Sequence, residues 1–489
     1  MNSKRLAEVQ SIRGHRVEAD GVISISFETA ERECREFIDQ HVKELNKENI
    51  AIRTEQMKRM IVNYVSDKKP RIRDYLRDDG SMDTSRLIID LVDNITDYGI
   101  LKQALEDDEI DEIRANGRYL FVEKNGFTEP YKDEQGKIIC FKSTDEMDII
   151  MRKLMGDIVF NKVNALVNGR TAEGYRIAAV HKEALSPDPI DSSNDGFNAF
   201  VLRKFKQNKP MLQDIVRKYH TMTDDMARLL MVAVEADFNI TTFGPTESGK
   251  TTTSNAIINT SIPKYTRTIL LQNPSEIDAR KRDSSGRIIN DVLHLEAYDM
   301  PGDISNTSPT MANEMMHILR LSPHRVIVGE ARTATEISNA EVISEAGHSF
   351  MLTGHAGDVE AAVQRILRGI LEANPALGVD MAMELTCNML EIVVIQKKMN
   401  DGTRKVCAIA EIEGSEGIKP IIRMLYEFQA ADNHRYDEND NLVEILGEYK
   451  KVGIPSKKLM SRIKEAGIMR KKYEFLEEEN RPQTFNGDF

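Results

Sequence analysis

The chain has 489 residues, with 66 lysines and arginines against 79 aspartates and glutamates, so its formal net charge at pH 7 is −13. This length favours two or three domains. The acidic balance argues against a protein that binds nucleic acids or membrane surfaces mainly through electrostatic attraction.

Two further composition features limit the class of protein. No apolar run is long enough to span a bilayer, and the first twenty residues are polar, so any membrane association is expected to run through partners. The four cysteines, Cys34, Cys140, Cys387 and Cys407, are scattered rather than paired. They predict reduced thiols of a cytosolic protein and no zinc site.

The N-terminal part of the sequence has a helical pattern. Residues 30–105 are highly charged, contain almost no glycine and place apolar residues at helical spacing, as in Met60, Ile61 and Tyr64. This pattern predicts a helical N-terminal extension over residues 1–105.

Residues 106–205 have a different sequence pattern, in which short apolar runs are separated by turns. The runs that predict strands are 119–122, 177–180 and 200–202. Residues 186–196 are rich in serine, aspartate and proline and are expected to form an exposed loop. Together these segments predict a small α/β domain.

From residue 223 onward, helix-like and strand-like segments alternate. Candidate strands are 240–243, 268–271, 325–328, 350–353 and 392–395. Such alternation predicts a mostly parallel sheet with helices on its faces.

A phosphate-binding pattern lies at the first of these strands. Gly244 to Thr251 read Gly-Pro-Thr-Glu-Ser-Gly-Lys-Thr, which is a full P-loop match between a strand-like run and a helix-like run. Backbone N–H groups and the helix N-terminus attract phosphate. The predicted nucleotide-binding residues of this loop are Gly244, Pro245, Thr246, Glu247, Ser248, Gly249, Lys250, Thr251 and Thr252. The alternative is a glycine turn with an incidental lysine.

Within the loop, Lys250 is expected to reach the terminal phosphates, and the Thr251 hydroxyl is expected to bind Mg²⁺. Glu330 directly follows the run 325–329 and is expected to orient magnesium through water or to polarise the attacking water. The alternative is an ordinary surface glutamate. His355 lies at the end of the strand-like run 349–356. It is expected to sense the terminal phosphate or to contact a neighbouring subunit. The alternative is a histidine that only caps a loop.

These motifs carry a family resemblance. The chain resembles the secretion ATPases of type II and type IV secretion systems and type IV pili, most of all the tight-adherence pilus branch. The stretches that carry the resemblance are the P-loop, 319–332, Gly347-His348, Thr353, His355-Ala356, 112–117, 123–126, Arg170, 174–176 and 203–205. It covers about residues 108–413.

The resemblance implies an α/β fold in which a RecA-like P-loop ATPase domain, residues 224–413, follows a smaller N-terminal sensor-like α/β domain, residues 106–205. A linker, residues 206–223, joins the two. The charged sequence after residue 413 predicts a helical C-terminal extension, residues 414–489, that ends in a polar tail. Its lysine-rich part is either a solvated appendage or a basic arm that binds a partner.

The family also implies roles for individual residues. Arg170, Arg176 and Arg203 are expected to approach the nucleotide from the N-terminal domain, because an always-charged guanidinium suits phosphoryl transfer. The alternative is that they are simple surface charges. Glu330 is the Walker B carboxylate, and His355 belongs to the family's histidine box. The metal ligands are then Thr251 and Glu330, and the cofactors are ATP and Mg²⁺.

Departures from the family pattern bear on turnover. The acidic pair of the family is replaced by Gln272-Asn273, although Glu276 remains acidic, and His294 and Tyr298 stand where arginines are common. The predicted catalytic residues are Glu330, Gln272, Glu276 and His355.

The P-loop departs from the family as well, because Pro245 and Glu247 stand where relatives have small residues. Glu247 repels polyphosphate unless its side chain points away, and Pro245 removes one backbone donor. Reduced turnover is therefore expected.

The function predicted from the sequence is that of a cytoplasmic hexameric ATPase, held at the inner face of the membrane by a platform protein. It couples hydrolysis to pilus assembly or to transfer of protein or DNA through an envelope machine. Nucleic acid is not expected as a direct partner. The alternatives are a weakly hydrolysing, nucleotide-gated scaffold and a nucleic-acid translocase on the same fold.

Overall fold

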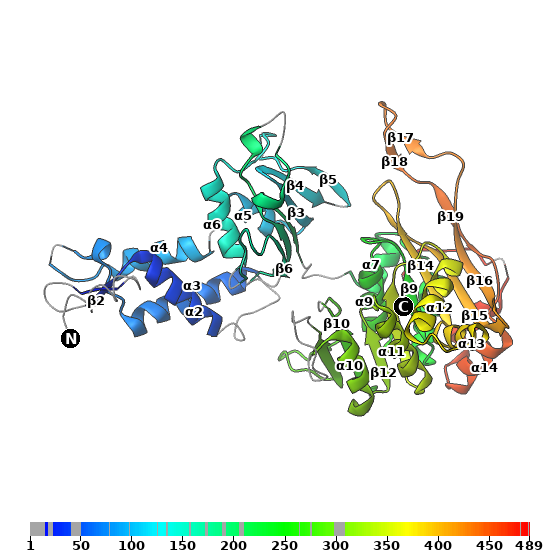
Figure 1. The fold of residues 1–489 in the computed structure, drawn as a ribbon. Coiled ribbons are helices and arrows are strands. Elements are labelled where there is room, and N and C mark those ends of the chain that lie inside the picture. The colour runs from blue at the N-terminus through cyan, green and yellow to red at the C-terminus, as the bar shows by residue number, and fades with distance from the viewer. Residues whose placement is uncertain are drawn as a thin grey trace. The chain divides into compact units, whose positions relative to one another are not determined.

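The computed structural model describes residues 15–17, 23–40, 50–77, 79–96, 98–124, 126–133, 135–155, 158–171, 175–187, 192–204, 210–263, 265–273, 276–297, 309–479, 481–487 and 489. The chain divides into two compact units, Met1–Gln207 and Asn208–Phe489 (Figure 1). Tyr298, Gly174, Phe205 and residues 206–209 of the predicted linker lie outside the described residues.

The first unit begins with a small helical bundle. A short hairpin of β1 (His15–Val17) and β2 (Ile23–Ile25) precedes α2 (Phe27–Gln40), α3 (Ile50–Lys68), a 3-10 turn (Arg73–Tyr75) and α4 (Thr84–Thr96). Apolar residues at helical spacing, including Ile61, Tyr64 and Leu91, form its core. The helices predicted between residues 30 and 105 are therefore present.

The rest of the first unit is a mixed α/β layer. A six-stranded antiparallel sheet of the described residues has the order β5-β4-β3-β8-β7-β6. Its strands are β3 (Ile110–Asn116), β4 (Tyr119–Lys124), β5 (Phe127–Pro130), β6 (Leu166–Arg170), β7 (Arg176–Val180) and β8 (Ala199–Arg203). The connecting helices are α5 (Lys102–Glu106) and α6 (Thr144–Met155), and 3-10 turns lie at Gly99–Leu101, Lys182–Ala184 and Ser192–Asn194.

Side chains alternate between the two faces of this sheet, as strand geometry requires. Ile113, Leu120 and Leu202 point to one face and share a core with Met147 and Leu154 of α6. The three predicted strands at 119–122, 177–180 and 200–202 are confirmed as parts of β4, β7 and β8.

The second unit starts with two helices that pack into its core. They are α7 (Leu212–Arg217) and α8 (Asp224–Glu235). Leu212, Ile215 and Val216 of α7 are buried in the main core of this unit. Residues 210–223, which were predicted as linker, are thus packed against the second unit.

The centre of the second unit is a sheet of nine described strands in the order β11-β10-β12-β13-β9-β14-β15-β16-β19. Its parallel part consists of β9 (Ile240–Phe243), β10 (Thr268–Gln272), β11 (Val292–Glu296), β12 (Arg325–Val328), β13 (Ser349–Gly354) and β14 (Ile392–Lys398). The helices are α9 (Lys250–Ser261), α10 (Met311–Ile318), α11 (Ala334–Glu345), α12 (Val359–Ala373) and α13 (Val379–Met389), with a 3-10 turn at Leu319–Leu321.

Helices cover both faces of this sheet. Alternate residues of the strands pack with α8 and α9 in one core and with α10 to α13 in another. For example, Ile327 joins the first core and Val328 the second. With the P-loop after β9, this arrangement is the predicted RecA-like P-loop fold, and all five predicted strands are confirmed.

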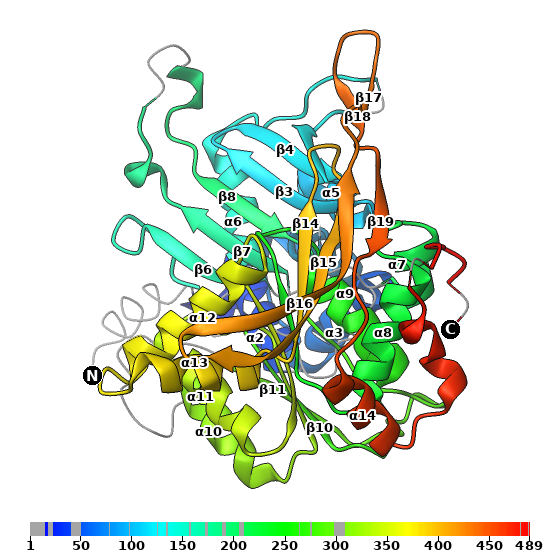
Figure 2. The ribbon, with the colours of Figure 1, turned by 90° about the vertical axis from the view of Figure 1, so that its right-hand side faces the viewer.

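The helical prediction after residue 413 is wrong for most of that region. The chain forms β15 (Arg404–Glu416), β16 (Lys419–Ala430), β17 (Arg435–Tyr436), β18 (Leu442–Glu444) and β19 (Gly447–Lys451) before α14 (Lys457–Glu465) and 3-10 turns at Arg470–Lys472 and Glu474–Glu477. Strands β15, β16 and β19 extend the sheet beyond β14, each antiparallel to the strand before it in the sheet. β17 and β18 project as a narrow hairpin (Figures 1 and 2).

The physical reason lies in the spacing of the charges. In β16 the charged side chains Arg423 and Glu427 are interspersed with aromatic and branched residues such as Ile422 and Tyr426. Ile422 packs against one core and Tyr426 belongs to the other, so both faces of β16 carry apolar side chains, while Arg423 pairs with Glu413 on the neighbouring strand β15. The high charge content was therefore misread as a solvated helix.

The C-terminal segment returns to α8. Lys472 Nζ lies 2.7 Å from a Glu235 carboxylate oxygen, and Arg481 Nε lies 3.0 Å from Asp225 Oδ2. The predicted polar tail is thus packed along the second unit. Across the described parts of the chain, no helix combines the length and apolar character that crossing a membrane requires.

Candidate functional site

The P-loop joins the central strand β9 to helix α9. Glu247 and Gly249 have φ values of 63° and 87°, in the left-handed region that favours glycine. At Gly244, a Cβ atom would lie 1.9 Å from the Gln396 carbonyl oxygen, so this position accepts only glycine. Both P-loop glycines are therefore required by the backbone path.

Lys250 begins α9 and turns back over the loop. Its Nζ donates hydrogen bonds of 2.8 Å to the carbonyl oxygens of Gly244 and Pro245. Burial lowers the pKa of Lys250, while the nearby carboxylates of Glu330 and Glu276 oppose this effect. Three predicted site residues thus lie within electrostatic reach of one another.

The remaining residues of the P-loop differ in their contacts and exposure. The Ser248 hydroxyl donates to the Pro245 carbonyl oxygen at 2.8 Å. Pro245 and Thr246 are exposed, whereas Thr251 and Thr252 are half-buried in the first turn of α9.

Glu330 and His355 come together at the carboxyl ends of β12 and β13. His355 Nε2 lies 2.8 Å from Glu330 Oε1, and His355 Nδ1 lies 3.2 Å from the Gly244 carbonyl oxygen. Arg332 Nε lies 3.1 Å from the other Glu330 oxygen. The imidazole ring thus lies between the Glu330 carboxylate and the backbone of the P-loop.

The order of the strands explains this meeting. β13 pairs with β9 on one side and with β12 on the other, so the segments after all three strands meet at one edge. The Thr353 hydroxyl also donates to the Gly329 carbonyl oxygen, which ties β13 to the segment that carries Glu330.

Gln272 closes the corner at the end of β10. Its Oε1 accepts hydrogen bonds from the backbone N–H groups of Glu276 (2.8 Å) and Ile277 (2.6 Å), and its Nε2 donates to the Ile277 carbonyl oxygen (3.0 Å). The buried amide therefore holds the following loop. A catalytic role for Gln272 stays a prediction.

His294 lies on β11, with its Nε2 3.6 Å from Asp278 Oδ1. Asp278 also pairs with Arg280. The position that the family resemblance assigned to an arginine is thus occupied by a histidine beside an acidic side chain.

The three predicted arginines of the first unit stand in one row. Arg170 is the register partner of Arg176, and Arg176 is that of Arg203. All three lie on the sheet face opposite the core, since directly paired residues share a face. Their contribution to nucleotide binding stays a prediction.

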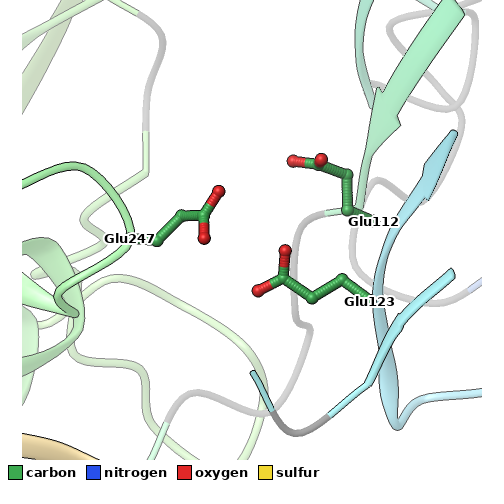
Figure 3. Close-up of side chains that lie close together, drawn as sticks. All are labelled: Glu112, Glu123 and Glu247. Atoms are coloured by element: carbon green, nitrogen blue, oxygen red, sulfur yellow. The ribbon is translucent and has the colours of Figure 1, made fainter. Parts of the chain in front are cut away.

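The row continues with acidic residues that the sequence reasoning did not single out. Glu112 pairs in register with Arg203 on one side and Glu123 on the other, and both glutamates extend from neighbouring strands (Figure 3). Arg203 Nε lies 3.2 Å from Glu112 Oε2, and Arg114 Nη2 lies 2.7 Å from Glu123 Oε2. Ion pairs between neighbouring strands thus connect the basic and acidic residues on this face of the sheet.

The sequence reasoning also missed the partners of Glu247, the unusual acidic residue of the P-loop. Lys398 Nζ lies 3.1 Å from Glu247 Oε2, and Arg404 Nε donates to the Glu247 carbonyl oxygen at 3.0 Å. Each contact joins residues that are about 150 positions apart in the sequence, so no local sequence pattern predicts it.

The donor set at the site suits magnesium. The Thr251 hydroxyl and the Glu330 carboxylate supply oxygen atoms, which Mg²⁺ prefers. Both Glu330 oxygens already contact His355 and Arg332, so this carboxylate fits a role that acts on the ion through water.

The fold and the loop geometry define a RecA-like P-loop protein. The sequence model of the family described as "Type II/IV secretion system protein" matches residues 190–465, more than half of the chain. The chain belongs to this family.

Similarities to individual proteins are more distant. The chain is 26% identical over 218 residues to the conjugal transfer protein TrbB of Rhizobium radiobacter, covering 44% of this chain and 61% of that protein. It is 28% identical over 155 residues to the competence protein ComGA of Bacillus subtilis, covering 30% and 39%. The chain thus spans less than two thirds of these relatives.

Among solved structures, the Legionella pneumophila ATPase DotB aligns with 78% of this chain and 88% of its own chain, at 16% identity and a TM-score of 0.44.

Proposed function

We propose that this protein is an ATPase that binds Mg²⁺-ATP at the P-loop and works as the motor of a pilus or secretion machine. The observation that carries the proposal is the meeting of Lys250, Glu330 and His355 around the P-loop, in a chain of this secretion family.

The residues have separate tasks in this proposal. The P-loop N–H groups and the start of α9 bind phosphate oxygens, and Lys250 adds a cation at the terminal phosphates. Thr251 would hold the magnesium ion, which would supply positive charge beside the phosphates. Glu330 orients the attacking water.

His355 connects the Glu330 carboxylate to the Gly244 carbonyl group of the loop. A shift of the loop on phosphate binding or release would therefore move the carboxylate that serves the water. Catalysis of this kind depends mainly on positioning.

Assembly and location are parts of the same proposal. We expect a homo-hexamer in the cytoplasm that docks to an inner-membrane platform protein. The relatives are named for conjugal transfer and for competence, which supports transfer through an envelope machine without identifying the cargo.

A second candidate, a nucleotide-gated scaffold with slow turnover, is favoured by one observation. The Gln272 amide is used in three backbone hydrogen bonds, and the adjacent position is Asn273 rather than an acid. This corner therefore contributes no carboxylate to water activation at positions 272 and 273. A nucleic-acid translocase remains the third candidate, because one fold supports several functions.

The deciding experiment is steady-state phosphate release with Mg²⁺-ATP, with oligomeric state measured on the same sample. Turnover by a hexamer that disappears in Lys250→Ala supports the motor. ATP binding without turnover supports the scaffold, and strong stimulation by DNA or RNA supports the translocase. Equal turnover in Lys250→Ala would contradict the site assignment.

A further inference from the structure

The hairpin formed by β14 and β15 lies directly against the P-loop. β14 runs beside β9, with Ile395 opposite Phe243, and continues for three residues beyond the point where β9 ends. A register shift in the pairing with β15 occurs between Ile395 and Gln396. Such bulges bend a strand and often lie beside functional sites.

The bend brings the hairpin backbone and side chains to both P-loop glycines. The Gln396 carbonyl oxygen is the atom that excludes a side chain at Gly244. A Cβ atom at Gly249 would lie 2.9 Å from Arg404 Cδ and 3.0 Å from Gln396 Nε2. Residues Gln396 and Arg404 of the hairpin therefore pack directly against the P-loop backbone.

Two basic residues of the hairpin, Lys398 and Arg404, contact Glu247, which lies between these two glycines. Lys398 and Arg404 are register partners at the end of the hairpin. Lys398 binds the Glu247 carboxylate, and Arg404 donates to the Glu247 carbonyl oxygen. The side chains of Lys398 and Glu247 are only 22% and 28% exposed, which limits screening by solvent.

The charge of Glu247 makes this contact significant. A carboxylate in a phosphate-binding loop repels the phosphates. Glu247 also has a left-handed backbone, which is unfavourable for a residue with a side chain. The ion pair with Lys398 offsets the charge, and the Arg404 hydrogen bond supports the backbone.

The hairpin is itself anchored at its turn. Asp401 Oδ1 accepts from the Thr403 N–H (2.9 Å) and hydroxyl (2.7 Å), and Asp401 Oδ2 accepts from the Ile445 N–H at 2.7 Å. The strands after residue 413 are thereby connected to the P-loop through Asp401, Lys398 and Arg404.

We propose that the β14–β15 hairpin is a brace for the nucleotide-binding loop, in which Lys398 is a positioning residue that keeps the Glu247 carboxylate from opposing bound phosphate. This inference rests on the proposed nucleotide binding at the same loop. It assigns to the C-terminal strands a role in setting nucleotide affinity.

The test is a double-mutant cycle on the binding of a fluorescent ATP analogue with Mg²⁺. The four proteins are the wild type, Lys398→Met, Glu247→Gln and the double variant. Lys398→Met is expected to weaken binding about tenfold, since close charged partners couple by that order. Glu247→Gln is expected to tighten binding, and adding Lys398→Met to it is expected to change affinity little.

Lys397→Met is the matched control, because Lys397 is the neighbouring lysine on β14 and has the opposite side-chain direction. Lys398→Arg keeps the cation and is expected to restore most of the affinity. Thermal unfolding of each variant separates loss of the brace from loss of the fold.

The outcomes separate the two proposals. The brace proposal is wrong if Lys398→Met does not weaken binding of the analogue. It is also wrong if Lys398→Met weakens binding equally in the wild-type and Glu247→Gln backgrounds. If the wild type does not bind the analogue, or Lys250→Ala binds it equally well, the proposed nucleotide site is wrong instead.

Discussion

The Glu330 carboxylate and the His355 imidazole meet at 2.8 Å, and the same ring reaches the Gly244 carbonyl oxygen at 3.2 Å. One side chain thus joins the loop after β13 to the loop after β12 and to the P-loop. His355 is therefore placed to couple the position of the phosphates to the position of the carboxylate.

Replacing His355 with alanine removes both contacts. We expect phosphate release to slow by roughly 10- to 100-fold, because misplacing a positioned group has effects of this size. Nucleotide affinity is expected to change little, since the ring does not belong to the loop that binds phosphate. His317→Ala, on the exposed side of α10, is the control. Wild-type turnover in His355→Ala would contradict the coupling role.

Gln272→Glu tests the corner that lacks the family's acidic pair. The new carboxylate cannot donate to the Ile277 carbonyl oxygen, as Gln272 Nε2 does. We expect the free energy of unfolding to fall by about 1–3 kcal/mol, measured by denaturant titration.

Asn273→Asp adds a charge to the same corner without breaking those hydrogen bonds. It is therefore the cleaner test of whether an acidic residue raises turnover. For Gln272→Glu, a free energy of unfolding equal to that of the wild type would show that the amide contact with Ile277 is not needed for stability.

The hairpin turn gives a pH dependence of stability. Burial alone raises the pKa of Asp401, but hydrogen bonds from Ile445 and Thr403 outweigh it and leave the pKa below its ordinary value. An aspartate with a lowered folded pKa stabilises the protein above the unfolded pKa, near about 3.9. This contribution is lost as the pH falls through the folded value.

Asp401→Asn is expected to cost about 1 kcal/mol at neutral pH, because it weakens the hydrogen bonds to Ile445 and Thr403. The difference from wild type is expected to stay constant above about pH 5 and to shrink below it. Denaturant titrations at several pH values measure it. A difference that grows on acidification would contradict the assigned direction.

The buried thiols predict a labelling pattern. Burial raises the pKa of Cys34 to about 12 and that of Cys387 to about 11, so neither has appreciable thiolate at about pH 8. Cys140 and Cys407 are both partly exposed, but burial raises the pKa of Cys407, so Cys140 is expected to react first with iodoacetamide. Mass spectrometry of the native protein measures the order, and all four thiols are expected to react in denaturant.

Asp224 fastens the C-terminal segment to the start of α8. Its carboxylate accepts hydrogen bonds from the Thr484 hydroxyl (2.5 Å) and from the N–H groups of Asn486 (2.8 Å) and Gly487 (2.6 Å). Asp224→Ala is expected to speed hydrogen–deuterium exchange over residues 481–487, with Glu477→Ala as the control. Unchanged exchange would show that other contacts hold the segment.

Local patterns were sufficient for the core of the RecA-like P-loop domain. The strand bounds 240–243 and 325–328 were predictable because short β-branched runs next to a P-loop carry their own signal. The positions of Lys250 and Glu330 beside the loop follow from the motifs in the same way, and their roles stay predictions. The charged strand β16 was mispredicted, because charge content alone does not separate a strand that mixes charged and apolar residues from a solvated helix.

The sequence by itself determined the class of fold and the P-loop, since both depend on residues that are neighbours along the chain. Only the tertiary structure decided which distant groups meet, such as His355 with Glu330 and Lys398 with Glu247. These contacts depend on strand order and on a bulge, which set distances that no local pattern encodes.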